Sequence, residues 1–323
     1  MLGSVPEPTV LAPWKVSYEI LGRNRASIGH WFPAVKEAVD GQDFFKVPKT
    51  KIVKVPLPIL QLTRMDYQEL TRTTLDIVDR FCMEAFDLDE DKAYFIRTGT
   101  ASSKFDHRNA KIQGAKEVRE LGEYLLFIHH QQISLAYPMN VKKVEEDGTF
   151  VEKPVSVYGA GTTNEWCVRE YIEDLDTPGN PCIYHGLPLR TEYRCFVDFD
   201  TDTVAGIFPY WEPGLMERSF MSGPEAGTPD NVHDGIVFHM HEDRLMERFH
   251  ANKDRVMENM AALVPDIDLS GQWSVDIMQN GDDFYIIDLA PAATSALADM
   301  LPPGTLWTEE EDWLPKRFLI RNA

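Results

Sequence analysis

The sequence has few cysteines, and it lacks both of the glycine-rich loops that most often bind nucleotide phosphates. Its cysteines are scattered along 323 residues and include no C-x-x-C pair: Cys82, Cys167, Cys182 and Cys195. This pattern predicts reduced thiols in a cytosolic protein and argues against a disulfide framework or a cysteine-based zinc site. Because neither G-x-G-x-x-G nor G-x-x-x-x-G-K followed by Ser or Thr occurs, the Rossmann and P-loop interpretations lack their signatures.

Long apolar runs are also missing. No stretch approaches the ~20 apolar residues that a membrane-spanning helix needs. The N-terminal segment MLGSVPEPTVLAPW has neither a basic start nor a continuous apolar region, although a secretory signal peptide carries both. We therefore expect a cytoplasmic protein with no membrane partner.

Basic residues are in short supply. The chain has 32 Lys and Arg against 52 Asp and Glu, a net charge of −20 and a pI near 4.8. Extensive nonspecific binding to nucleic acid needs a basic surface, so the composition disfavours it. Residues 46–54 and 104–119 are locally basic and could still form a restricted groove. A chain of this length, with 43% hydrophobic residues, is expected to form two or three closely packed subdomains.

The order of the expected elements indicates an α+β fold. Strands are expected at 93–97, 166–172, 191–199, 204–210, 273–278 and 284–289. Helices are expected at 63–86 and 241–264, and one or two helices at 107–136. Residues 46–62 contain three prolines and are expected to form an edge strand or strand-loop rather than a helix. A hairpin tip, EEDGT, is expected within 145–153, and the Pro-rich residues 1–20 are expected to be extended. Hairpins separated by long helices are typical of α+β proteins and not of a doubly wound parallel sheet.

The first candidate functional segment is FIRTGTASSKFD, at 95–106, where a short strand runs into a loop of small residues. Small residues let backbone N–H groups approach an anion closely. Arg97 and Lys104 supply positive charge, and a guanidinium can bind phosphate bidentately. The loop hydroxyls that can donate to phosphate oxygens are those of Thr98, Thr100, Ser102 and Ser103. A solvated turn with two surface cations is the alternative.

The second segment, VREYIED at 168–174, is an expected strand that ends in acidic residues before a Pro/Gly loop. It could be a hinge between subdomains, with backbone groups reading an adenine edge and an acid holding ribose hydroxyls. The candidate nucleotide-binding residues here are Glu170, Tyr171, Ile172 and Glu173. An edge strand with exposed acids is the alternative.

The third segment, RTEYRCFVDF at 190–199, is an expected strand with two different faces. By the period of two, Glu192, Arg194 and Phe196 share one face. The other face is expected to join the core through Tyr193, Cys195, Val197 and Phe199. In the functional interpretation Arg194 contacts phosphates, and Glu192 contacts the nucleotide or orders Arg194. A simple exposed ion pair is the alternative.

The fourth segment, WSVDIMQNGDDFYIIDLAP at 273–291, is the most informative. Asp276 and Asp288 each lie inside an apolar strand, where a lone charge is costly unless it is paired or bound to metal. Carboxylate oxygens suit Mg²⁺ that also bridges phosphates. A two-residue turn at 280–281 would place the aspartates on opposite faces, so we expect a three-residue bulged turn at 280–282, with Asp288 diagonal to Asp276. Alternatively, one aspartate caps a loop and the other is exposed at a sheet edge.

One further pattern, HDGIVFHMHEDR at 233–244, places His239 and His241 two residues apart. A His-x-His pair can ligate zinc, but no third ligand accompanies it here. A surface or helix-entry role is expected instead.

Taken in this order, the four segments resemble the ATP-grasp superfamily. Within it they are most similar to the branch of the cell-division-cycle-protein-123 group and related phage and bacterial proteins. The resemblance rests on SSKFD, EYRCFV, SVDIM and YIIDLAP, and it spans roughly residues 93–291. It implies two α+β subdomains, 91–172 and 173–323, that grip ATP between their sheets, with an N-terminal accessory or substrate region at 1–90.

The resemblance also implies residue roles. Arg97 or Lys104 would stand where the family has its phosphate-binding cation, and residues 170–173 would form the hinge. Glu192 and Arg194 would match the family's Glu-x-Arg motif.

By the same resemblance, Asp276 and Asp288 would be the magnesium ligands. There are two departures from the family pattern. Many ATP-grasp enzymes carry Lys at the position of Arg97. The last metal motif, usually Asp-x-Asn-Pro, here reads Asp-Leu-Ala-Pro, and the side chain of Ala290 cannot ligate a metal.

The leading functional hypothesis is an ATP- and magnesium-dependent ligase. It would activate a carboxylate as an acyl phosphate for attack by an amine or thiol, with Arg97, Lys104 and Arg194 as catalytic residues. Its partner would be an unknown small-molecule, peptide or protein acceptor. The first alternative is a nonhydrolytic ATP-binding assembly chaperone resembling the cell-division-cycle-protein-123 group, which acts on a translation initiation factor. The second is an RNA or nucleotidyl ligase that carries AMP on Lys104.

Overall fold

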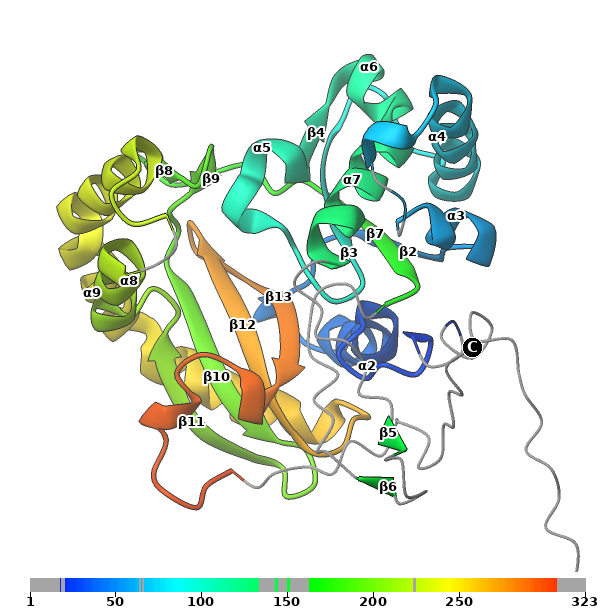
Figure 1. Cartoon of the computed structure of the whole chain (residues 1–323). Coiled ribbons are helices and arrows are strands. Elements are labelled where there is room, and N and C mark those ends of the chain that lie inside the picture. The colour runs from blue at the N-terminus through cyan, green and yellow to red at the C-terminus, as the bar shows by residue number, and fades with distance from the viewer. Residues whose placement is uncertain are drawn as a thin grey trace, which may run out of the picture.

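The computed structural model describes residues 18, 21–63, 65, 67–133, 143–144, 150–151, 163–222 and 225–306. In these residues the chain is an α+β protein, as its sequence predicts. Two principal sheets, A and B, are accompanied by helices (Figure 1).

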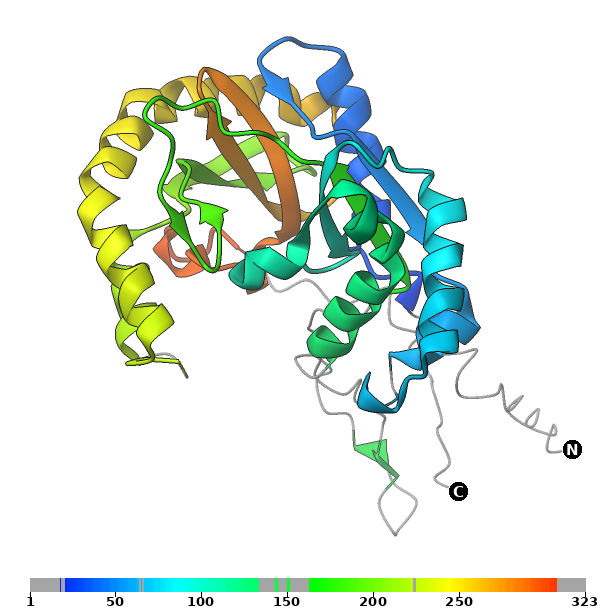
Figure 2. The same ribbon diagram turned by 90° about the horizontal axis from the view of Figure 1, so that it is seen from above.

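Sheet A has five strands in the order β1-β13-β12-β10-β11. They are β1 (Phe45–Lys46), β10 (Glu192–Asp198), β11 (Thr203–Pro209), β12 (Gln272–Asn280) and β13 (Asp283–Pro291). One face is apolar because alternate residues of the central strands are apolar, among them Tyr193, Cys195, Val275 and Ile277. That face packs against α2 (Ile28–Asp40) and α9 (Pro229–Leu263). Figure 2 shows α9 curving round the outside of the sheet.

Sheet B has four strands in the order β2-β7-β3-β4. They are β2 (Thr50–Lys54), β3 (Ala93–Thr98), β4 (Lys111–Gln113) and β7 (Glu165–Glu170). One face packs through Tyr94, Ile96, Trp166 and Val168 against the helices of the second core. Its principal helices are α4 (Arg72–Phe86) and α7 (Leu121–Ile133). The intervening strand residues face the other way, and several of them line a cavity between this sheet and sheet A.

The remaining elements are short. They are α3 (Leu57–Leu62), α5 (His107–Ala110), α6 (Gly114–Arg119), α8 (Pro213–Ser222), β5 (Lys143–Val144), β6 (Phe150–Val151), β8 (Cys182–Ile183) and β9 (Leu187–Pro188). The 3₁₀ turns are η1 (Tyr67–Glu69), η2 (Lys104–Asp106), η3 (Val264–Asp266), η4 (Ala292–Thr294) and η5 (Ala298–Met300).

Most expected elements are present, with four differences. Helix α4 begins at Arg72, after the turn η1, and not at residue 63. Residues 57–62 are helical, because Pro56 stands at the N-cap and a second proline lies in the first turn, where its missing N–H costs nothing. Strand β4 lies within the range 107–136, where only one or two helices are expected. Helix α9 begins at Pro229, well before the expected start, after an N-cap by the Thr228 hydroxyl.

The turn between β12 and β13 also differs from the expectation. The prediction of a three-residue turn at 280–282 is wrong. Asn280 pairs with Asp283, so only Gly281 and Asp282 remain in the loop. Gly281 has φ +60°, a left-handed conformation that glycine adopts without strain.

A β-bulge at Ile287 nevertheless places the two aspartates on the same face of the sheet, as expected. The register shifts between Asp276 and the next residue of β12, so Ile287 has no partner on the opposing strand. The inserted residue reverses the alternation that a two-residue turn would impose. Asp276 and Asp288 are therefore directly opposite each other rather than diagonal.

The region expected to be accessory contributes to both sheets. Strand β1 pairs with β13 in sheet A, and β2 pairs with β7 in sheet B. The divisions 1–90, 91–172 and 173–323 remain predictions.

Three expectations fall wholly or partly outside the described residues. Apart from Tyr18, the segment 1–20 lies outside them, and so do the EEDGT tip and the last three residues of the helical range 107–136. The strands on either side of that tip pair antiparallel. The four cysteines are free thiols, and Cys182 is the exposed one. In the part of the chain that the structure describes, no helix combines the length and apolarity needed to cross a membrane.

Candidate functional site

Residues from all four candidate segments line one cavity between sheets A and B. The predicted site residues that line it are Arg97, Ser102, Lys104, Glu170, Tyr171, Ile172, Glu192, Asp276 and Asp288. The predicted residues outside the lining are Thr98, Thr100, Ser103, Glu173 and Arg194. Lining residues that sequence reasoning did not select include Phe95, His107, Arg169, Arg190 and Met278.

Sheet A supplies a row of charged side chains across three adjacent strands. Arg194 is in register with Asp276, which is in register with Asp288. The Arg194 guanidinium donates from Nε and Nη2 to the two oxygens of Asp276, each at 2.8 Å, and from Nη1 to the Ala296 carbonyl at 3.2 Å. Burial lowers the pKa of Arg194, but Asp276, Tyr210 and Asp288 together outweigh burial and raise it. Arg194 therefore supports the cavity by holding Asp276.

Two arginines project from sheet B towards sheet A. Arg97 on β3 is 1% exposed, and its Nη1 donates to Asp288 Oδ1 at 2.9 Å. Arg169 on β7 is 5% exposed, and its Nη1 donates to the Ile287 carbonyl at 2.5 Å. The Nε and Nη2 groups of Arg169 are buried and have no oxygen or nitrogen acceptor, and the Cys167 thiol is a neighbour of the guanidinium. Burial lowers the pKa of Arg169. Buried donors of this kind are normally satisfied, so the environment of Arg169 leaves its hydrogen-bonding capacity only partly used.

Sequence reasoning gave no role to Arg169. Strand alternation does place it on the face opposite Trp166 and Val168, whose side chains enter the second core. The missing information is that this face meets another sheet. Without it, a solvated surface arginine fits the pattern equally well.

Lys104 lies against aromatic rings and close to a buried acid. Its Nζ is 3.8 Å from the centroid of the Tyr210 ring, 5.3 Å from that of Trp211 and 3.7 Å from Glu192 Oε2. Burial lowers the pKa of Lys104, but Tyr210, Glu192 and Asp276 outweigh burial and raise it. Glu192 is 5% exposed, and its Oε2 has no hydrogen-bond partner. Burial raises the pKa of Glu192, and Lys104 opposes that shift.

The small-residue loop is held in place by helix α7. Thr98 Oγ1 donates to Gln132 Oε1 at 2.9 Å, and Gln132 Nε2 donates to Ser103 Oγ. Ser103 has φ +46°, so its backbone is in the left-handed region. Two of the four candidate hydroxyls thus shape the loop, and Ser102 is the one that lines the cavity.

Another part of the lining follows strand β7. Tyr171 and Ile172 lie there with Arg190, whose Nη2 donates to the Ile172 carbonyl at 2.7 Å. His107 Nε2 is 3.5 Å from the Tyr171 hydroxyl. Burial, helped by Lys111 and Arg190, lowers the pKa of His107 to about 4. The imidazole is therefore neutral near pH 7.

The lining is chemically suited to an anion with several oxygens. Four cationic side chains, Arg97, Lys104, Arg169 and Arg190, line the cavity in a chain with a net charge of −20. Arginine and lysine in a site that excludes water bind phosphate strongly. The acid Glu170, which also lines the cavity, is paired with Lys49 and Lys92.

The described residues contain no group of three His, Cys, Asp or Glu side chains that could hold a metal by themselves. The facing aspartates offer two carboxylates, and Mg²⁺ commonly takes one or two carboxylates and completes its shell with phosphate oxygens and water. His239 and His241 lie on α9, away from this lining.

No family model and no curated protein matches the chain. Among solved structures, Cdc123 from Schizosaccharomyces pombe is 13% identical, with 90% of this chain and 94% of that chain covered and a TM-score of 0.46. Its C-terminally truncated form gives 13% identity, 90% coverage of both chains and a TM-score of 0.43. A D-alanine–D-alanine ligase from Bacillus anthracis complexed with ATP is 9% identical, with 82% and 54% covered and a TM-score of 0.33. These likenesses concern coarse architecture alone.

Proposed function

We propose that the cavity between sheets A and B binds ATP with magnesium, and that the protein is an ATP-dependent ligase of the ATP-grasp type. The observation that supports this most directly is the approach of Arg97 and Arg169 from one sheet to the paired aspartates of the other. Donors for phosphate oxygens and carboxylates for a divalent cation thus face each other across one cavity.

The phosphate end of the site is proposed to consist of Arg97, Arg169 and Lys104. The hydrogen-bonding capacity of Arg169 is only partly used, and Lys104 carries a charge that its neighbours stabilise. Charge held in place before the reaction stabilises the charge that develops during phosphoryl transfer. These cations would bind and orient the triphosphate and exclude water from it.

Asp276 and Asp288 are proposed to hold magnesium. Asp288 is the more accessible, with its side chain 32% exposed against 9% for Asp276. When bound there, Mg²⁺ would supply charge neutralisation at the phosphates. The adenine base of ATP is proposed to lie against Tyr171 and Ile172, with Glu192 near the ribose and the phosphates.

Lys104 does not suit the alternative of a covalent AMP carrier. A lysine nucleophile must be deprotonated, and active sites of that kind lower its pKa. The neighbours of Lys104 raise its pKa instead. Its proposed role is therefore electrostatic.

A nonhydrolytic ATP-binding module is the second candidate. Two observations favour it: Ala290 has no metal-ligating side chain, and both aspartates already have an arginine partner. Such a module would bind ATP with little turnover and serve in assembly with a protein partner.

Calorimetry with ATP, with and without Mg²⁺, tests the proposed site. Wild type should bind ATP more tightly with Mg²⁺, and Asp288→Asn should remove that Mg²⁺-dependent gain. Unchanged binding by Asp288→Asn would contradict the metal assignment. ADP release in the presence of pooled amino acids and peptides separates a ligase, which turns over, from a binding module, which does not.

A further inference from the structure

The segment that leaves sheet B after β7 changes partners within two residues. Tyr171 N donates to the Ala93 carbonyl at 2.9 Å, which continues the pairing of sheet B. The Ile172 carbonyl instead accepts from Arg190 at 2.7 Å. Beyond Ile172 the segment bonds to the β12–β13 turn and to helix α9. The boundary between the two sets of contacts therefore lies inside the cavity lining.

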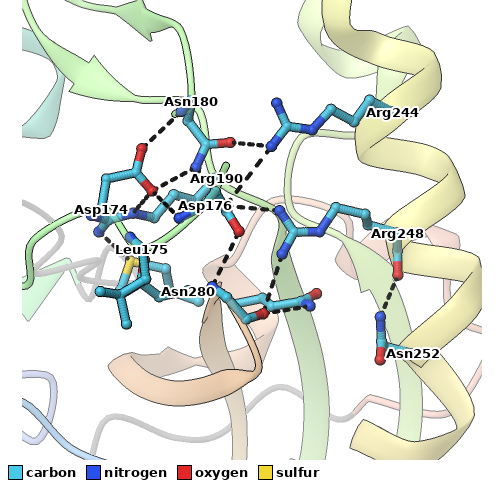
Figure 3. Close-up of polar contacts among 12 residues, drawn as sticks. Asp174, Leu175, Asp176, Asn180, Arg190, Arg244, Arg248, Asn252 and Asn280 are labelled. Atoms are coloured by element: carbon cyan, nitrogen blue, oxygen red, sulfur yellow. Dashed lines mark hydrogen bonds and ion pairs between the residues drawn. The ribbon is translucent and has the colours of Figure 1, made fainter. Parts of the chain in front are cut away.

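Asn280, the last residue of β12, holds this segment with both ends of its side-chain amide. Its Nδ2 donates to the Glu173 carbonyl at 2.9 Å, and its Oδ1 accepts from Leu175 N at 3.0 Å. Asn280 is 1% exposed, so neither contact is readily replaced by water. The amide pairs with the backbone of residues 173–175 as a neighbouring strand would. Figure 3 shows Asn280 beside Leu175.

Asp176 provides a second attachment to the same turn. Its Oδ1 accepts from Gly281 N at 3.2 Å, and its Oδ2 accepts from Arg248 Nη1 on α9 at 2.8 Å. Burial raises the pKa of Asp176, but hydrogen bonds from Arg248 and Asn180 outweigh burial and lower it. The carboxylate is therefore charged at neutral pH and binds the segment firmly.

Arg190 connects these contacts to the cavity. Its Nε is 3.8 Å from Asp174 Oδ1, and Asp174 in turn accepts from Asn180 N at 2.8 Å and from Asn180 Nδ2 at 3.0 Å (Figure 3). Arg190 then donates to the Ile172 carbonyl. The position of Ile172 is thus set from the side of sheet A and α9.

We propose that Asn280 is a positioning residue of the nucleotide site, and that it holds residues 172–175 where they receive the base. This inference rests on the proposed function, in which Tyr171 and Ile172 contact the base. Loosening the segment would weaken contacts with the base. It would leave the triphosphate contacts of Arg97 and Arg169 in place.

The first test compares two ligands. Affinities for Mg-ATP and for Mg-tripolyphosphate, which has no base, are measured by calorimetry on wild type, Asn280→Ala and Asn280→Asp. The aspartate keeps the Oδ1 acceptor and loses the Nδ2 donor. Both variants should bind ATP about tenfold more weakly, as expected for one or two lost buried hydrogen bonds, and tripolyphosphate within about twofold of wild type. Asn259→Ala is the control, because that exposed amide on α9 donates to the Arg255 carbonyl alone.

The second test needs no ligand. Hydrogen–deuterium exchange at residues 172–176 should be faster in both Asn280 variants than in wild type, with β10 and β13 unchanged. Unchanged exchange, or an equal loss of both ligands, would overturn the positioning role. If wild type binds neither ligand, the proposed function fails and this inference falls with it. If the positioning role alone is wrong, wild type still binds both ligands.

Discussion

Replacing Lys104 by methionine tests the electrostatics of the cavity at little change in volume. In the wild type, Lys104 Nζ lies 3.7 Å from Glu192 Oε2, and that oxygen has no hydrogen-bond partner. The substitution removes this cation from a buried carboxylate. Burial raises the pKa of Glu192, and Lys104 opposes that shift. In the variant, Glu192 can therefore avoid an uncompensated charge by binding a proton.

Proton binding sets an upper limit on the part of the stability loss that comes from the Glu192 charge. Glu192 has an ordinary pKa of 4.5, so keeping it protonated in the folded state at pH 7 costs at most about 1.36 × 2.5, or about 3.4 kcal/mol. At pH 5 the same limit is about 1.36 × 0.5, or about 0.7 kcal/mol. A carboxyl whose pKa is raised by folding loses stability as the pH rises from the unfolded towards the folded pKa. The variant should therefore be destabilised most at pH 7.

Urea unfolding of the wild type, Lys104→Met, Glu192→Gln and the double variant, at pH 7 and pH 5, measures this directly. We expect a loss of about 1–3 kcal/mol for Lys104→Met at pH 7, a much smaller loss at pH 5, and substantial recovery in the double variant. The affinity for ATP should fall at least about tenfold in Lys104→Met and in the double variant, because both lack a charged side chain that is proposed to bind phosphate. An equal loss of stability at both pH values, or no recovery with Glu192→Gln, would refute the reasoning.

Three further predictions concern other parts of the molecule. Arg169→Met should weaken binding of both ATP and tripolyphosphate by about tenfold or more, measured by calorimetry, whereas Arg80→Met on the exposed side of α4 should change neither. Gly99→Ala should lower the free energy of unfolding by about 1–3 kcal/mol, because an added Cβ would lie 2.2 Å from Ser27 Oγ and 2.3 Å from Thr163 Oγ1. Gly41→Ala is the control, because its added Cβ would come no closer than 3.3 Å to another atom. Folding lowers the pKa of His107 from 6.5 to about 4, so the neutral imidazole stabilises the fold fully above pH 6.5, and this contribution is lost as the pH falls towards 4. His107→Phe should therefore reduce the loss of stability between pH 6.5 and 4 by up to about 3 kcal/mol, measured by urea unfolding.

The sequence was most informative where polar and apolar residues alternated with the strand period of two. In residues 192–199 the period of two separated a polar face from an apolar face, and the structure confirms that Tyr193 and Cys195 enter the core while Glu192 lines the cavity. Asp276 and Asp288 stood out because charged residues are rare inside apolar strands. The sequence predicts that both carboxylates lie on one face, but it does not predict the β-bulge at Ile287 that places them there.

Long-range contacts limited the rest of the prediction. Thr98 and Ser103 look like phosphate donors in isolation, but Gln132, some thirty residues away in the chain, engages both hydroxyls. Arg169 and Arg190 look like surface arginines until the two sheets are brought together. A local pattern specifies which face a side chain occupies, and only the packing of elements specifies what that face meets.

The bulge at Ile287 shows how one local irregularity can organise the whole site. Without it, a two-residue turn would place Asp288 on the apolar face, where it could not meet Asp276. The bulge also leaves Ile287 without a partner on β12, and the Ile287 carbonyl accepts from Arg169 of the other sheet. The adjacent Asp288 binds Arg97. One inserted residue therefore aligns the two aspartates within sheet A and also provides two neighbouring points at which sheet B is held against it. Bulges beside functional sites commonly redirect side chains in this way, and here the redirected carboxylate and the released carbonyl each meet a buried arginine.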